Sequence, residues 1–304
     1  MKNSRFYGVY SKGFSLIELM VALAIGLFLL AGVFTVYVNG VQSTRVVDDQ
    51  TVMVDNVRFA LEAISADTRQ AGVFGRVLPK VDAGGVINID NTTAAGSVAA
   101  ECYAGWALNV ANPIMVSNDA APFPIGGPCI SNYLQGDTLE VRGTLRTPVV
   151  AAAQQANVFY INSDVNAAQF YYGNVSPNIS TRFADYNYYN HFYYIAPFSD
   201  NAADGIPSLH RVSLQPGGVV SDQVLLSGVS NMQIQLGLNT DNSEDGTVDS
   251  YADASAGLNW AQVKSIQVTL TVVSQDSNYT GTNTAGGRRQ MTVNSVTALR
   301  DINL

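Results

Sequence analysis

SKGFSLIELMVALAIGLFLLAGVFTVYV, residues 11–38, holds a single charge after its lysine, the carboxylate of Glu18. Residues 19–38 are twenty consecutive residues without a charge. At about 1.5 Å per residue they form a helix of ~30 Å, the thickness of a bilayer core, so the stretch predicts a membrane-spanning helix. A secretory signal would place a small-residue cleavage site after its apolar run. Here the basic stretch ends at Lys12, before that run, and no such site follows promptly.

Residues 12–19, KGFSLIEL, resemble the processing signal of type IV prepilins and type II secretion pseudopilins. The resemblance implies that a prepilin peptidase cleaves between Gly13 and Phe14 and methylates the new amino terminus. The alternative is an ordinary signal anchor with an isolated glutamate. A carboxylate within a membrane helix costs roughly 2.5–3.5 kcal/mol on insertion scales and is seldom kept without a partner, which favours the prepilin interpretation.

The resemblance also implies a role for Glu18, the fifth residue of the mature chain. In the family this carboxylate pairs with the positive amino terminus of a neighbouring subunit. Because an unpaired buried charge is strongly unfavourable, such a pair would fix the axial register of bundled helices. Glu18 is therefore predicted to be an assembly residue. Its presence argues against the one pseudopilin type that lacks this glutamate and sits at the extreme tip.

Past the membrane segment, the apolar residues fall on one side of a helix. Their spacings of three, four and seven are typical of an amphipathic helix, and Gly72 is expected to follow its end. Because the first proline is Pro79, one helix is predicted from about Phe14 to Ala71. Many major pilins have a proline where this chain has Thr35. The one-sided apolar positions are Val46, Met53, Val57, Ala60, Leu61 and Ile64.

Residues 67–75, DTRQAGVFG, narrow the resemblance. A stalk helix ending in Asp-x-Arg-x-Ala-Gly, in a chain much longer than a usual pilin, resembles the PilW family of minor pilins, and residues 289–300 are similar to that family's last strand. The resemblance implies an α+β, type IV pilin-like fold, in which a long N-terminal helix packs on a C-terminal antiparallel β-sheet head. The expected divisions are a prepilin leader (1–13), the pilin helix (14–72, transmembrane over about 16–38) and a periplasmic or extracellular β-rich head (73–304).

The head is predicted to be mainly β-structure. Residues 232–238 and 266–272 alternate between apolar and polar side chains, the period of half-buried strands, and one face of each is expected on the stalk helix. Residues 138–142 and 211–214 are expected to form further strands. Residues 80–135 are rich in Ala, Gly, Asn and Pro and lack such a period, so we interpret them as a long variable excursion.

The chain has two cysteines, Cys102 and Cys129, and begins like an exported protein. A single disulfide is therefore the simplest interpretation. In the chain-entropy model a loop of this size would stabilise the fold by roughly 3 kcal/mol. The alternative is a pair of free thiols.

Residues 241–249, DNSEDGTVD, match the front half of an EF-hand-like loop. Oxygen-bearing side chains occupy its first, third, fifth and ninth places, and glycine occupies the sixth. Calcium takes about six to eight oxygen ligands, and the twelfth place holds Ala252 where a glutamate is expected. A structural calcium ion is one hypothesis, and a solvated acidic turn is the other. The predicted ligands are Asp241, Ser243, Asp245 and Asp249.

Residues 186–194, YNYYNHFYY, contain five tyrosines. Tyrosine-rich surfaces suit adhesion, because they offer contact area at little cost in entropy. The other interpretation is a strand whose rings cover the sheet and the core while their hydroxyls find partners. We favour the strand, because residues 192–197 resemble a strand of the PilW family.

An enzyme is not expected. The chain has two histidines, His191 and His210, and no GxSxG, HExxH or phosphate-cradling glycine loop. The net charge of −8 also disfavours a broad nucleic-acid surface, because phosphate contacts need clustered Lys and Arg. No direct nucleic-acid binding is therefore expected.

The resemblance implies a single-pass inner-membrane prepilin that becomes a minor pilin on the cell surface. Its expected partners are the prepilin peptidase, other minor pilins and the major pilin. Its expected role is to help initiate type IV pilus assembly and to sit near the tip, supporting adhesion, twitching motility or DNA uptake. The alternatives are a J-type minor pseudopilin of type II secretion and a ligand-binding tip adhesin. No cofactor is expected apart from the hypothetical calcium.

Overall fold

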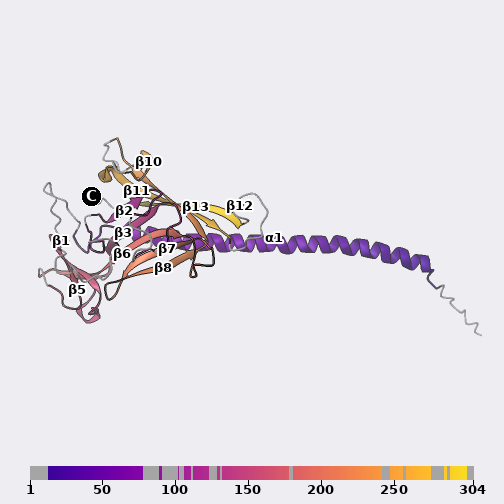
Figure 1. Cartoon of the computed structure of the whole chain (residues 1–304), viewed down its shortest axis with the longest axis horizontal. Helices are drawn as coiled ribbons and strands as arrows, with labels where there is room; N and C mark the ends of the chain where they lie inside the picture. Colours follow the sequence, from indigo (N-terminus) through magenta and orange to yellow (C-terminus); the bar gives the residue numbers. More distant parts are fainter. Residues whose placement is uncertain are drawn as a thin grey trace, which may run out of the picture. The chain divides into compact units, whose positions relative to one another are not determined.

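The computed structural model divides the chain into two units, Met1–Val52 and Met53–Leu304 (Figure 1). Helix α1, Leu16–Gln70, begins in the first unit and ends in the second. The described residues are 13–77, 89–90, 102, 106–110, 112–122, 129–130, 132–177, 181–241, 247–255, 258–274, 284–285 and 288–299.

The first unit consists of the N-terminal part of α1, and nearly all of its side chains are exposed within this chain. Thr35 does not interrupt the helix, because threonine, unlike proline, keeps its backbone N–H. Its Oγ1 donates a hydrogen bond of 2.9 Å to the carbonyl oxygen of Ala31, one turn earlier. The prediction of one long helix through this position is confirmed. The leader residues 1–12 lie outside the described residues.

In the second unit the larger sheet has eight strands in the order β1-β5-β4-β6-β3-β2, with β7 pairing both β6 and β8. Its pairs are antiparallel except for β1 with β5. Two short 3-10 helices, η1 (Ala151–Ala153) and η2 (Trp260–Gln262), lie in connections. The strands are β1 (Ile89–Asp90), β2 (Ile114–Ser117), β3 (Thr138–Thr144), β4 (Phe159–Ser163), β5 (Ala168–Tyr172), β6 (Ala184–Ala196), β7 (Ser208–Gln215) and β8 (Val219–Ser227).

The smaller sheet has five antiparallel strands in the order β10-β9-β11-β13-β12. The strands predicted over 232–238 and 266–272 are β9 and β11, which are direct neighbours, with Ile266 opposite Leu236. This arrangement confirms the predicted α+β layout of a long helix with antiparallel sheets. The strands are β9 (Val229–Leu238), β10 (Ser250–Asp253), β11 (Val263–Val273), β12 (Thr284–Ala285) and β13 (Arg288–Ala298).

One hydrophobic core joins the last turns of α1 to both sheets. Val57, Ala60, Leu61 and Ile64 are buried on one side of the helix, as their spacing predicts. Full burial of a side chain such as Leu61 or Ile64 contributes about 1.5–3 kcal/mol. The sheet residues of this core include Leu139, Val141, Tyr193, Ile195, Leu209, Met232, Ile234, Leu236, Ile266, Val268 and Leu270.

A second core covers the other face of the larger sheet. It contains Trp106, which is fully buried, and the disulfide between Cys102 and Cys129, whose Cα atoms are 5.2 Å apart. The predicted disulfide is thus confirmed. It anchors described parts of the excursion predicted over 80–135 beneath the sheet.

Strand β6 supplies both cores, because successive side chains of a strand point to opposite faces. Tyr189 and Tyr193 belong to the core around α1, whereas Tyr188 and Tyr194 belong to the second core. The Tyr188 hydroxyl donates to the carbonyl oxygen of Ala107 at 2.5 Å. The interpretation of the tyrosine-rich segment as a packed strand is confirmed, because its five tyrosines are buried.

The close approach of α1 to β3 predicts a severe effect of adding one methyl group. A Cβ at Gly143 would lie 2.5 Å from the carbonyl oxygen of Gln70 and 2.9 Å from the hydroxyl oxygen of Tyr189. Gly143→Ala should therefore lower the free energy of unfolding by about 1–3 kcal/mol, measured by chemical denaturation of the full chain in detergent. Gly40→Ala is the control, since its added Cβ meets no heavy atom within 4 Å beyond the local backbone of the helix. Equal stability of Gly143→Ala and the unaltered chain would contradict this packing.

Candidate assembly site and the helix–head junction

The first turn of α1 carries the predicted assembly residue. The Glu18 amide donates a hydrogen bond of 3.0 Å to the carbonyl oxygen of Ser15, where the helix begins. A carboxylate in the first turn of a helix interacts favourably with the helix dipole, by about 0.3–1 kcal/mol. Among the described residues, Glu18 has no ion-pair partner in its own chain. Phe14, the predicted mature N-terminus, is 83% exposed.

Within the described residues, α1 is the one helix long and apolar enough to cross a membrane, and its most apolar window is not buried by the rest of the chain. Its surface is not smooth. Glu18 lines a shallow hollow with Val21, Ala22 and Ile25. These features support membrane anchoring and leave the apolar surface of α1 open to another helix or to lipid.

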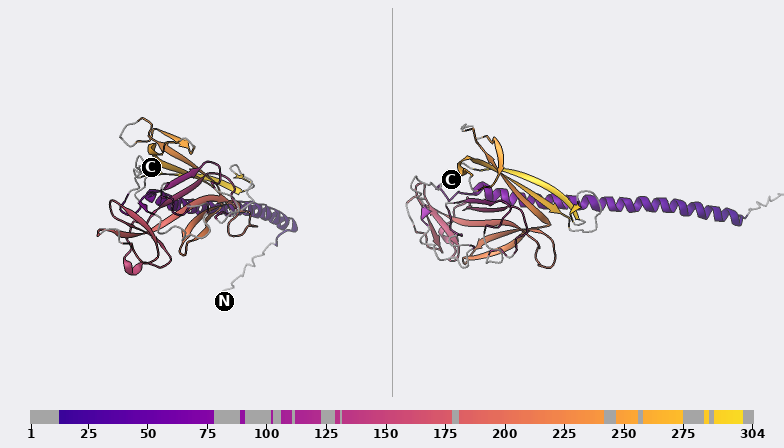
Figure 2. Two further views of the ribbon diagram at one scale, coloured as in Figure 1. Left: turned by 60° about the vertical axis from the view of Figure 1, so that its left-hand side comes forward. Right: turned by 45° about the horizontal axis from the view of Figure 1, so that its top comes forward.

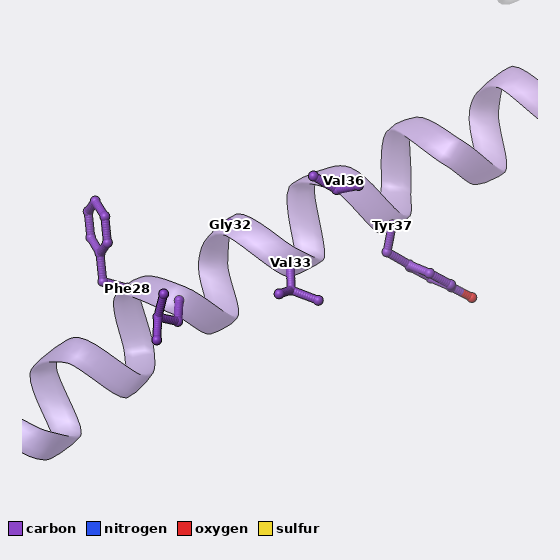
Figure 3. A pocket seen from close by; sticks show the side chains of 6 residues that line it. Phe28, Gly32, Val33, Val36 and Tyr37 are labelled. Carbon is purple, nitrogen blue, oxygen red and sulfur yellow. The ribbon is translucent and has the colours of Figure 1, made fainter.

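A second hollow lies where Gly32 leaves the helix backbone uncovered (Figure 3). Side chains project from the helix around this glycine, and small residues at such positions let the backbones of two membrane helices approach closely. The hollow is therefore suited to packing against a neighbouring apolar helix. Its lining residues are Phe28, Leu29, Gly32, Val33, Val36 and Tyr37.

The junction between α1 and the head depends on Asp67, near the end of the helix. Its Oδ2 lies 2.5 Å from Nδ1 of His191 and also accepts a hydrogen bond from the Tyr193 hydroxyl. The Tyr189 hydroxyl donates to the backbone carbonyl of Asp67 at 3.1 Å. Three side chains of β6 thus bind a single helical residue.

The rest of the motif over 67–72 closes the helix against the sheets. Arg69 donates to the backbone carbonyl and the hydroxyl of Ser65, and the Ser65 hydroxyl lies 2.6 Å from that of Thr297 on β13. Gly72 has a φ of 70°, which glycine adopts without strain after a helix. Its amide donates to the carbonyl oxygen of Arg142 at 3.0 Å. The motif over 67–72, which resembles the PilW family, therefore joins the end of α1 to the sheets of the head.

The electrostatics of the junction keep the tyrosines neutral. Burial, and then the neighbouring Asp67 carboxylate, raise the pKa of both Tyr189 and Tyr193 above the usual value. A neutral hydroxyl can donate to a carboxylate, whereas a phenolate beside Asp67 would repel it. The two neutral hydroxyls therefore donate to Asp67, that of Tyr193 to its side chain and that of Tyr189 to its backbone carbonyl.

A buried ion pair supports the second core. Arg142 and Glu140, both on β3, are in contact and almost inaccessible to solvent. Burial raises the pKa of the Glu140 carboxyl, and the Arg142 guanidinium opposes that shift. Arg142 also donates to the backbone carbonyls of Trp106 at 3.2 Å and Asn112 at 2.6 Å. The pair therefore ties described parts of the excursion to the sheet.

Both histidines take part in structural hydrogen bonds. His191 contacts Asp67 as described, and His210 lies 3.0 Å from Oδ1 of Asp222 and 3.1 Å from the carbonyl oxygen of Phe198. The Tyr194 hydroxyl donates to the same Asp222 at 2.5 Å. Within the described residues, the partners of both histidines are carboxylates and a backbone carbonyl.

The predicted calcium loop is described only in part. Asp249 is turned toward the loop backbone, since its Oδ2 accepts from the amides of Thr240 at 2.6 Å and Asp241 at 3.1 Å. Ser243 and Asp245 lie outside the described residues. Among the residues that are described, no three His, Cys, Asp or Glu side chains are grouped to hold a metal ion. Calcium binding therefore stays a prediction.

The fold and the helix surface together define a pilin-like protein, in which one exposed apolar helix carries a first-turn carboxylate and anchors an antiparallel head. Comparison with family models narrows this class. Residues 10–34 match the prokaryotic N-terminal methylation motif, and residues 192–301 match Type IV Pilus-assembly protein W. Both matches support a type IV pilus minor pilin and confirm the resemblance to the PilW family. The curated proteins and the solved structures yielded no match.

Sequence reasoning placed Glu18 and the cysteines but did not identify Asp67, His191 and Tyr193 as a junction. Asp67 begins the motif over 67–72, but that motif indicates no function for its side chain. Its partner His191 is 124 positions away, and no local pattern indicates which carboxylate a distant histidine will meet.

Removal of the Asp67 side chain should weaken the junction. Asp67→Ala would leave the fully buried Tyr193 without its acceptor, and an unsatisfied buried donor costs about 1–3 kcal/mol. We expect a loss of this size in the free energy of unfolding of the full chain. Asp55→Ala is the matched control, since Asp55 is exposed on the same helix. A loss no larger than that of the control would show that the junction does not stabilise the head.

Proposed function

We propose that this chain is a minor pilin that helps to initiate type IV pilus assembly and sits near the pilus tip. The observation that carries the proposal is Glu18. This carboxylate stands in the first turn of an exposed apolar helix, and the described part of its own chain offers it no ion-pair partner. Such a charge is costly in an apolar surrounding unless another molecule supplies a partner.

The mechanism is packing and charge pairing. Cleavage after Gly13 by the prepilin peptidase creates a positive amino terminus on Phe14. In a bundle of apolar helices, the Glu18 carboxylate of one subunit pairs with the amino terminus of a neighbouring pilin. A shifted register leaves a buried charge unpaired, so that register is rejected. The partners are other minor pilins and the major pilin, which the chain joins from the inner membrane.

The size of the head supports a position near the tip. The second unit extends from Met53 to Leu304, and the described part of it contains two sheets and two hydrophobic cores. A head of this size repeated along the whole filament would crowd its neighbours, whereas one or a few copies at an end are easily accommodated. We propose that the head supports adhesion, twitching motility or DNA uptake as a structural element rather than by catalysis.

The test of this mechanism is the entry of Glu18→Ala into pili. The variant should be cleaved at Gly13 like the unaltered chain, yet its amount in sheared surface pili should fall about tenfold or more, the effect of losing ~1.4 kcal/mol or more of pairing energy. Immunoblots of sheared pili and of membranes measure the two pools. Glu62→Ala is the control, because Glu62 is an exposed glutamate on the same helix.

Three results would count against the proposal. Normal entry of Glu18→Ala into pili would contradict the pairing mechanism. Unchanged numbers of surface pili in a strain lacking the whole chain would contradict a role in initiation. Loss of hydrolase secretion in that strain, with pili intact, would indicate a pseudopilin of type II secretion instead.

A further inference from the structure

The sheet edges of the second unit are not alike. An exposed strand edge pairs readily with other chains, so soluble proteins guard such edges with short strands, charges, prolines or bulges. Strand β2 has four residues and follows Pro113, and β10 has four residues and ends in Asp253. Strand β8 carries Asp222 and a register shift against β7.

Over most of its length, strand β13 has none of these features that prevent pairing. It has eleven residues, begins with Arg288 and Arg289, and carries neither charge nor proline over 290–298. Figure 2 shows β13, in yellow, running along the rim of the smaller sheet. On its outer side, β12 pairs only with Arg288 and Arg289. Among the described residues, no strand pairs with the outer side of the remaining length, which is long and uncharged.

The backbone of this edge has unused hydrogen-bonding groups. The amide of Leu299 donates to Lys264 of β11, and the amide of Ser274 donates to the carbonyl of Arg289. In an antiparallel pair the bonding residues alternate, so the odd-numbered residues of β13 bond β11 and the even-numbered ones face outward. Among the described residues, none forms a backbone hydrogen bond with the outward-facing groups of Thr292, Asn294, Val296 and Ala298.

The side chains beside the edge suit an uncharged strand. Thr292, Asn294 and Val296 are exposed, and they stand opposite Thr271, Thr269 and Gln267 of β11. In a chain with a net charge of −8, the pair of strands has no charged side chain over 265–273 and 290–298. A partner strand with Thr, Asn or Val at the facing positions would form favourable cross-strand pairs and meet no repulsion.

From this geometry we propose that the outer edge of β13 receives an extended, uncharged strand from the head of a neighbouring pilin subunit. The inference rests on the proposed function, because a filament holds pilin heads side by side. Thr297 of β13 is hydrogen-bonded to Ser65, so β13 is held beside the last turns of α1. Neighbouring heads have a high effective concentration, and a short pairing of four outward residues then suffices.

The experiment places a photo-crosslinking amino acid at position 294 of the full chain in living cells, followed by shearing of the pili. A control places it at Gln223, which is exposed on the guarded edge of β8. We expect a covalent adduct with another pilin from position 294 and none from position 223. Mass spectrometry of the adduct should identify a segment rich in uncharged residues in the partner's head.

A second variant tests the edge without a crosslinker. Asn294→Lys places a charge on the outward face, and recovery of the chain with other pilins in sheared surface pili should fall about tenfold. Gln223→Lys should leave that recovery unchanged. Both side chains are exposed, so both variants should keep the thermal unfolding midpoint of the unaltered chain.

The outcomes separate this inference from the proposed function. Presence of the chain in sheared pili, with no adduct from position 294 or equal adducts from both positions, would overturn the edge proposal alone. Absence of the unaltered chain from sheared pili would overturn both. Unchanged recovery of a folded Asn294→Lys chain in sheared pili would also overturn the edge proposal.

Discussion

The burial of one face of the last turns of α1 is the constraint on which the rest of the second unit depends. Val57, Ala60, Leu61 and Ile64 pack among residues of both sheets, so the helix and the two sheets share one core. Asp67 then binds β6 at the end of the buried face. The helix is therefore part of the head's core and not a tether attached to it.

The N-terminal part of the helix and the head differ in the partners that their side chains have. The N-terminal part of α1 has no partner among the described residues of its own chain and is apolar on all sides, apart from Glu18 near its start. In the head, buried tyrosine hydroxyls donate to carbonyl oxygens and a carboxylate, and a buried ion pair lies on β3. Within the described residues, the exposed apolar surface of α1 and the edge of β13 are two features that suit contact with other subunits.

Much of this was predictable, because it depends on local periodicity. The spacing of Val57, Leu61 and Ile64 indicates the buried face of a helix, and the alternation over 232–238 and 266–272 indicates the two paired strands. The tyrosine-rich segment was predictable as a packed strand because residues 192–197 resemble a strand of the PilW family. The disulfide was predictable because the chain has two cysteines and an N-terminal segment typical of exported proteins.

What could not be predicted depends on contacts distant in sequence. A Glu and an Arg two residues apart usually indicate a solvated strand face. Glu140 and Arg142 are nevertheless buried, because residues around Trp106 and Asn112 of the same chain cover them. The pairing of Asp67 with His191 likewise arises only when β6 crosses the helix end. The free edge of β13 depends on strand order, which the alternation of side chains does not encode.

The central claim is that the chain is a processed pilin whose mature form enters a filament. The measurement that tests it most directly is the intact mass of the protein in sheared surface pili, compared with its mass in a strain that lacks prepilin peptidase. The account predicts a chain that begins at N-methylated Phe14 in the pili, and an uncleaved chain confined to membranes in the other strain. A chain found only uncleaved in both strains, or cleaved elsewhere and absent from pili, would contradict it.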